Sequence, residues 1–232
     1  MNRRQIFKSI LLTTVISASA SPIITAPALA MRDVDEPFCI AIDDIRKVPR
    51  KFRRKEVVFP TTEVPGSIVV DPYTKYLYFI AGNGRAIRYG IGVGRQGFEW
   101  SGEAVIRRKA KWPRWTPPKE MVARDPLAAK WKDGMPGGPE NPLGARALYL
   151  YQGDVDTLYR IHGTFQPESI GKAVSSGCIR LINADIVDLY KRVSIGAKVI
   201  VLQGSPDLIT EAPPRRRKFL FARDRWGDRS NK

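Results

Sequence analysis

The stretch SSGCIR, residues 175–180, and the shorter stretch IHGT, residues 161–164, decide how this sequence is interpreted. His162 is the only histidine among the 232 residues, and Cys178 is one of two cysteines. A cysteine nucleophile requires a nearby base that reaches the same substrate carbonyl, and histidine serves that purpose most often. We therefore predict that Cys178 is a nucleophile and that His162 is its general base.

The residues beside Cys178 favour a reactive thiol. Gly177 has no side chain, so a substrate carbonyl can approach closely, and the amides of Gly177 and Cys178 are candidate donors to an oxyanion. Oriented amides and a neighbouring imidazolium would also lower the pKa of the thiol. Arg180 shares a face with Cys178 in an extended segment and suits a substrate carboxylate. Two plainer interpretations remain, namely a buried structural role for His162 and Cys178 or a disulfide between Cys39 and Cys178.

Short runs of β-branched and aromatic residues, separated by turn signals, predict a mainly β fold. We expect strands at residues 67–70, 76–81 and 86–91 to form an antiparallel meander. Further strands are predicted at residues 146–152, 157–162 and 197–203. One helix is predicted at residues 183–193, where Asn183 can cap the first turn and apolar residues recur at helical spacing.

A long segment, residues 92–144, is dense in Gly, Pro and Trp, and a loop of this length is usually functional. Trp115 is a candidate substrate contact within a lid, although a hydrophobic cluster that pins the loop explains it equally well. Residues 141–144 (NPLG) are interpreted as a turn before a strand. Residues 92–97 spell a glycine-rich nucleotide motif, but no helix start follows, so nucleotide binding is excluded.

The N-terminus resembles a targeting segment. Three cations precede a mostly apolar run, and residues 28–30 (ALA) form a small-residue cleavage site, so residues 1–30 are predicted to be a signal peptide. The paired Arg3 and Arg4 also match a twin-arginine export signal. A retained membrane anchor is the alternative. Residues 31–65 are expected to form a basic extension with a short helix near residues 40–47, and residues 204–232 a basic tail.

The formal charge is +16, or +13 without the three cations of the signal (16 − 3), which suggests a polyanionic neighbour. Nucleic acid is one candidate, but an exported protein instead meets anionic lipid headgroups and wall carboxylates. We therefore predict a place in the periplasm or cell envelope, no nucleic-acid partner, and peripheral contact with anionic membrane or wall. With one histidine and two distant cysteines, no metal and no cofactor are predicted.

Several motifs, in the right order, resemble the signature of the YkuD-type L,D-transpeptidases. The resemblance covers residues 66–203 and implies the fold of that catalytic domain, a compact mainly β sandwich with a few short helices and a long lid-like loop. The matching motifs are IHGT at 161–164, IG at 170–171, SSGCIRL at 175–181, Asn183 with Asp185, DLY at 188–190, WTPP at 115–118 and NPLG at 141–144.

The resemblance also implies an activity. In this family the cysteine attacks the carbonyl of the third residue of a peptidoglycan tetrapeptide stem and expels the terminal D-alanine. The acyl group then passes to an amine of another stem, giving a 3→3 cross-link, or to an amine of a protein acceptor. Carried over to this chain, Cys178 is the nucleophile, His162 the base, and the carbonyl of Gly163 orients the imidazole.

The substrate-binding residues implied by the resemblance lie next to these. Ser175 matches the signature serine, Arg180 stands where the family has a polar residue, and Trp115 belongs to the expected lid. Ser176 replaces a histidine that many members have, which leaves the acceptor preference open. An L,D-carboxypeptidase or amidase-like hydrolase acting on the same stems is the alternative. A second alternative is a non-catalytic protein that binds the cell wall.

Overall fold

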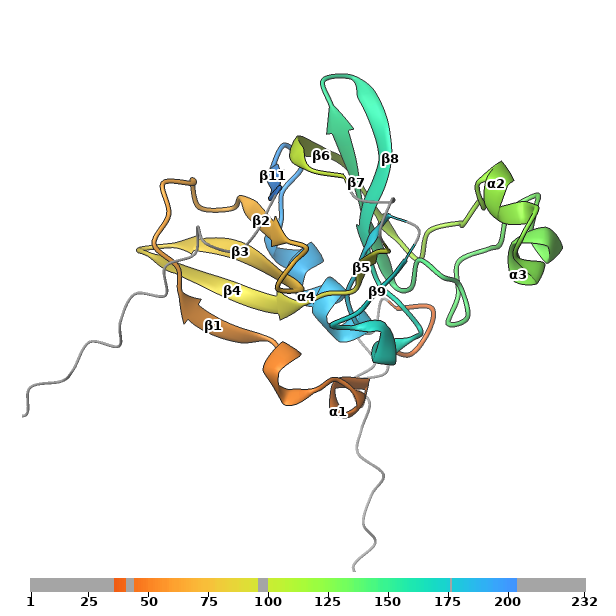
Figure 1. Cartoon of the computed structure of the whole chain (residues 1–232), viewed down its shortest axis with the longest axis horizontal. Coiled ribbons are helices and arrows are strands. Elements are labelled where there is room, and N and C mark those ends of the chain that lie inside the picture. Colours follow the sequence, from red (N-terminus) through yellow and green to blue (C-terminus); the bar gives the residue numbers. More distant parts are fainter. Residues whose placement is uncertain (1–35, 41–43, 96–99, 176, 204–232) are drawn as a thin grey trace, which may run out of the picture.

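The structure is a computed structural model that describes residues 36–40, 44–95, 100–175 and 177–203. The predicted signal peptide and the predicted basic tail lie outside the described residues, as do residues 96–99 and Ser176. Most described residues belong to strands and the turns between them, with few and short helices (Figure 1). The predicted mainly β fold is therefore confirmed.

The strands form one large sheet and one small one. The large sheet has nine strands in the order β1-β4-β3-β2-β11-β6-β7-β8-β10, and β5 pairs with β9. The bounds are β1 (Lys55–Val58), β2 (Ile68–Asp71), β3 (Tyr76–Gly82), β4 (Arg85–Gly90), β5 (Val93–Gly94), β6 (Gly102–Lys111), β7 (Arg146–Gln152), β8 (Val155–His162), β9 (Ala173–Ser175), β10 (Ile179–Arg180) and β11 (Lys198–Val201).

The helices are short, and one of them packs into the core. They are α1 (Asp44–Lys47), η1 (Arg50–Phe52), α2 (Lys119–Val122), α3 (Pro126–Lys130), η2 (Pro167–Ser169) and α4 (Asn183–Arg192). The amphipathic helix α4 buries Ile186 and Leu189 and packs against β7. None of the helices in the described ranges is long and apolar enough to cross a membrane.

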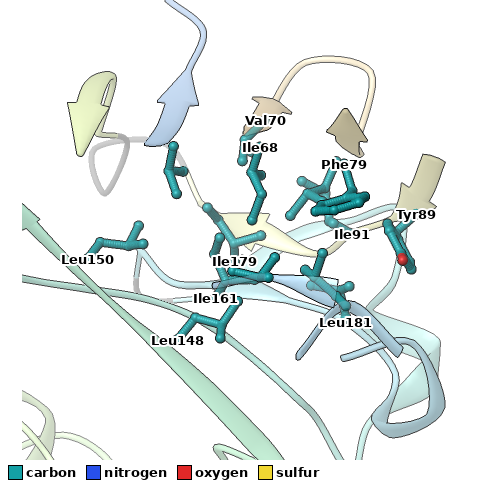
Figure 2. Packing of buried hydrophobic residues seen from close by; sticks show 14 of the residues in the cluster. Ile68, Val70, Phe79, Tyr89, Ile91, Leu148, Leu150, Ile161, Ile179 and Leu181 are labelled. Carbon is teal, nitrogen blue, oxygen red and sulfur yellow. The ribbon is translucent and has the colours of Figure 1, made fainter. Parts of the chain in front are cut away.

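The main core lies between the two halves of the large sheet. Figure 2 shows side chains of β2 and β3 facing side chains of β7, β8 and β10 across a common apolar interior. Burying one such aliphatic side chain contributes about 1.5–3 kcal/mol, so this contact holds the two halves together. The labelled residues are Ile68, Val70, Phe79, Tyr89, Ile91, Leu148, Leu150, Ile161, Ile179 and Leu181.

The predicted meander is confirmed, because β2, β3 and β4 pair consecutively and antiparallel. Strand β6 was not predicted and falls within the segment expected to be a long loop. Only Ala104 and Ile106 are buried along its ten residues, and most of the others are charged, so the apolar alternation is short. Residues 55–58, expected to belong to the N-terminal extension, form β1 and pair with β4 at the sheet edge.

The rest of the predicted long loop is an excursion, residues 112–145, that carries α2 and α3. Trp115 is buried there against Ala128 and Met135, in a small cluster separate from the main core. Asn141 is fully buried, and its side-chain amide donates to the carbonyls of Pro113 and Pro136. This confirms the structural role expected for residues 141–144 and favours the pinned-loop interpretation of Trp115.

A short N-terminal segment, residues 36–40, is docked on the excursion. The carboxylate of Glu36 forms an ion pair with Arg146, and the Trp112 indole Nε1 donates to Glu36 at 2.7 Å. Only 4% of the Glu36 side chain and 2% of the Arg146 side chain are exposed. The Phe38 ring meets the Trp112 ring edge-on with centroids 5.0 Å apart. The buried Glu36–Arg146 ion pair and the contact between the Phe38 and Trp112 rings therefore fix this segment to the start of β7.

Candidate active site

Parallel pairing of β8 and β10 brings the two predicted catalytic residues together. Ile179 pairs with Ile161, and Arg180 pairs with His162. One residue before Ile179, Cys178 falls opposite Arg160 in the same register. Directly opposed residues in a sheet share a face, so Cys178 and His162 occupy diagonal positions on one face.

The imidazole of His162 is buried and held in one orientation. Its Nδ1 lies 2.6 Å from the carbonyl oxygen of Gly163, as the resemblance implied. A carbonyl can only accept, so Nδ1 carries the proton and Nε2 keeps its lone pair. Burial lowers the pKa of His162 to about 3, and the charges of Arg180 and Arg160 act in the same direction. The resting imidazole is therefore neutral and able to take a proton.

The thiol of Cys178 is also neutral at rest. Burial raises its pKa, and this outweighs the hydrogen bond from the Arg160 backbone and the positive charges of Arg160 and Arg180, which act in the opposite direction. The prediction that the surroundings of Cys178 lower the pKa of its thiol is therefore wrong in direction. Cys178 and Cys39 are both free thiols, and the alternative disulfide does not form.

Ser175 fixes the backbone around the nucleophile. Its hydroxyl donates to the carbonyl oxygen of Cys178 at 2.7 Å and accepts from the backbone N–H of Gly177 at 3.2 Å. Gly177 has a φ of 114°, a left-handed value that a side chain would disfavour. Because its N–H already has this partner, Gly177 is a weaker candidate for the oxyanion than the sequence suggested.

Arg180, which was predicted to bind a substrate carboxylate, pairs with His162 two residues after Cys178. Its Nη1 is 3.4 Å from the Gln166 side-chain oxygen, and its Nε is buried without a hydrogen-bond partner among the described residues. Burial lowers the pKa of Arg180, while the neighbouring Cys178 raises it. A buried donor without a partner costs about 1–3 kcal/mol, which a bound carboxylate would recover.

Asn183 holds three segments of the site together. Its side-chain oxygen accepts from the backbone N–H of Ala145 at 2.9 Å, and a Cβ on Gly144 or Gly163 would lie 2.3 Å from that oxygen. Its expected role as the cap of α4 is wrong, because Ile182 occupies the cap position. The side chain instead ties the turn before β7 to the loop that follows His162.

The glycine-rich stretch after β4 also serves the site. Gly92 and Arg180 exchange backbone hydrogen bonds of 2.9 and 2.8 Å, so Gly92 supports β10 from the side opposite β8. A Cβ on Gly92 would lie 2.8 Å from the carbonyl oxygen of Ser169. The glycine is therefore needed for close packing beside the catalytic strand.

A cavity of about 240 Å³ opens beside Gly177. Trp100 and Tyr159 line it, and their rings stack with centroids 5.4 Å apart. Burial raises the pKa of Tyr159, and the charge of Cys178 acts in the same direction. The tryptophan that lines the cavity is Trp100, which was not predicted, whereas Trp115 belongs to the excursion.

The described side chains contain no group of three or more His, Cys, Asp or Glu residues that could hold a metal ion. The chemistry available at this site is that of a thiol, an imidazole and two guanidinium groups. Such a set suits nucleophilic attack on a carbonyl with proton transfer to the base.

The burial of His162 predicts a pH-dependent stability. Its folded pKa lies below its unfolded value, so acidification below about 6.5 protonates the unfolded chain first and destabilises the fold. Burial raises the pKa of Asp185 to about 6, which favours the folded state on acidification and opposes this effect. The wild-type protein should therefore lose more stability on acidification than His162→Gln, which lacks the imidazole. We expect the difference between their free energies of unfolding (wild type minus variant) to decrease by up to about 1.4 kcal/mol for each pH unit from pH 6 down to pH 4. Urea denaturation at several pH values measures the difference, and a constant difference would contradict the burial of a neutral imidazole.

Comparison with known proteins identifies the family of the chain. A family model described as the L,D-transpeptidase catalytic domain (YkuD) matches residues 65–201. The chain belongs to the L,D-transpeptidase catalytic domain family. The probable L,D-transpeptidase YbiS of Escherichia coli (strain K12) is 34% identical over 154 residues, 62% of this chain and 47% of that protein. The probable L,D-transpeptidase ErfK/SrfK of the same strain is 33% identical over 164 residues, 68% of this chain and 50% of that protein.

The chain thus spans about half the length of the curated L,D-transpeptidases it matches. A crystal structure from Brucella melitensis, described as a probable carnitine operon oxidoreductase, is 51% identical and covers 69% of this chain and 99% of that one. Its TM-score is 0.47, so this likeness carries no weight for the fold or for the activity of the L,D-transpeptidase domain.

Proposed function

We propose that the protein is an L,D-transpeptidase that acts on peptidoglycan tetrapeptide stems through an acyl-enzyme on Cys178. The observation that carries the proposal is the pairing of β8 with β10. It sets Cys178 diagonally opposite a buried His162 whose Nδ1 is bound to the Gly163 carbonyl. The thiol thus has a base whose Nε2 lone pair is available.

Each step of the proposed reaction can be assigned to a side chain of the site. As the Cys178 sulfur attacks the carbonyl of the third stem residue, the thiol proton passes to His162 Nε2. The bond to the terminal D-alanine breaks, His162 returns the proton to the leaving amine, and a thioester remains. An acceptor amine then loses a proton to His162, attacks the thioester and releases the thiol. Arg180, with its buried Nε, is proposed to bind a carboxylate of the stem.

The place of action and the acceptor belong to the same proposal. An export signal at residues 1–30 would deliver the enzyme to the periplasm or cell envelope, where its stem substrate is found. The acceptor is either a second stem, giving a 3→3 cross-link, or an amine of a protein. Net positive charge suits peripheral contact with the anionic membrane or wall. The substrate-binding roles of Ser175, Ser176 and Trp115 remain predictions.

The test is product analysis by mass spectrometry. Purified protein is incubated with disaccharide-tetrapeptide, with and without a second stem as the amine acceptor, beside Cys178→Ala. We expect loss of D-alanine, a covalent adduct on the wild-type protein, and a 3→3 dimer that needs the acceptor. The Cys178→Ala variant should give none of these. Tripeptide as the only product would identify the hydrolase, and a folded wild-type protein without adduct or product would indicate a wall-binding protein.

A further inference from the structure

A row of four side chains crosses the sheet and ends at the nucleophile. Arg108 on β6 pairs with Tyr149 on β7, and Tyr149 pairs with Arg160 on β8. Cys178 lies next in the row, one residue before the paired positions of β10. Because directly opposed residues share a face, Arg160 is the cation in this row that stands next to the thiol.

Arg160 is held from two directions. Its two terminal nitrogens donate to the two carboxylate oxygens of Asp156 at 2.6 and 2.8 Å. Its guanidinium carbon lies 4.4 Å from the centre of the Tyr149 ring. A bidentate ion pair and a cation–π contact together restrict the orientation of a guanidinium group. The Arg160 side chain is also only 13% exposed. The guanidinium is therefore fixed in place on the face of the sheet that Arg160 shares with Cys178.

We propose that Arg160 is a positioning residue for Cys178, whose fixed guanidinium stabilises the thiolate when the proton leaves for His162. This inference rests on the proposed function, since it explains how a buried thiol becomes nucleophilic. The charge of Arg160 acts on both Cys178 and His162. A positive charge favours the thiolate and disfavours the imidazolium, so the proton on His162 is poised to move on to the leaving amine.

The other groups around the sulfur have different tasks. Tyr159 on β8 lines the cavity. Arg180 on β10 reaches toward Gln166, and Arg95 acts on Arg180 from beyond it. His162 takes the proton. Arg160 is bound to the carboxylate of Asp156 and is therefore unavailable to the substrate.

The test measures the reactivity of the thiol itself and needs no peptidoglycan. Iodoacetamide alkylation is followed against pH by intact mass in a Cys39→Ser background, because Cys39 is exposed and would also react. We expect Arg160→Gln to move the midpoint of the pH–rate profile up by about one pH unit, which is roughly tenfold slower alkylation below both midpoints. Arg160→Lys keeps the charge and should return the midpoint toward that of the parent.

Arg108→Gln is the matched control. Arg108 also stacks on Tyr149 with its guanidinium carbon 4.4 Å from the ring centre, but two strands, β7 and β8, separate it from Cys178. Its removal should leave the profile unchanged. An Arg160→Gln profile that coincides with that of Arg108→Gln, with the protein folded, would overturn the proposal and leave Arg160 a structural role only.

A second variant covers the case in which Arg160→Gln does not fold. Asp156→Asn keeps Arg160 on the Tyr149 ring and removes the carboxylate that offsets its charge. We expect the alkylation midpoint to fall, and an unchanged midpoint would count against an electrostatic role. Since the readout requires only the thiol, failure of this inference is distinguishable from failure of the transpeptidase reaction.

Discussion

Replacing His162 by Gln is expected to slow acylation of Cys178 by roughly 10²–10⁴-fold at pH 7, because the variant lacks the base that removes the thiol proton. Burial raises the pKa of the thiol, so few molecules hold a thiolate without help at that pH. The measurement is the rate at which a carbapenem, an acylating mimic of the stem, forms an adduct detected by intact mass.

The pH dependence separates loss of the base from loss of the fold. Acylation of His162→Gln should rise as the pH approaches the raised pKa of Cys178, since hydroxide then generates the thiolate. The wild-type rate should level off at a lower pH. Cys178→Ala serves as the control that forms no adduct at any pH. A folded His162→Gln protein that reacts at the wild-type rate at pH 7 would show that His162 is not the base.

Replacing Arg146 by Met is expected to lower the free energy of unfolding by about 3–5 kcal/mol, because it leaves the Glu36 carboxylate buried without its partner. Burial alone would raise the pKa of Glu36, but hydrogen bonds from Arg146 and Trp112 outweigh it and hold the pKa below its usual value. Urea denaturation followed by circular dichroism measures the loss.

The exposed pair of Arg107 and Asp154 is the matched control. Their nitrogen and oxygen lie 2.7 Å apart, but 48% and 94% of these side chains are exposed. Arg107→Met should therefore cost less than about 1 kcal/mol. Adding Glu36→Gln to Arg146→Met should recover part of the loss, since a neutral amide costs less to bury than a charge. Equal losses for Arg146→Met and Arg107→Met would contradict the burial of the pair.

The elements that could be predicted from the sequence are those with a repeated apolar pattern. The meander and the β7–β8 hairpin consist of short runs of β-branched and aromatic residues bounded by turns, and the motifs that carry Cys178 and His162 end up on or beside paired strands. Strand β6 was missed because its outward positions carry charges and its inward positions include only two buried residues.

The residues that could not be predicted act through contacts between distant segments. Asn183 reaches Ala145, 38 residues away, and Gly92 pairs with Arg180 across the site. A local sequence pattern does not show which distant residues come into contact in the fold. The direction of the pKa of Cys178 was also wrong, because neighbouring charges are visible in the sequence but the depth of burial is not.

The position of β11 has a consequence for how the chain folds. This strand, the last in the described part of the chain, lies between β2 and β6 and pairs in parallel with β2 and antiparallel with β6. Val199 lies opposite Ile68, so the contact closes a loop of about 130 residues, and contacts of such separation slow folding. Until residues 198–201 have been synthesised, β2 and β6 each keep an unpaired edge that can recruit other chains. The two halves of the sheet thus become hydrogen-bonded to each other only when β11 has been made, so closure of the sheet is a late event and the nascent domain must be kept from aggregating until then.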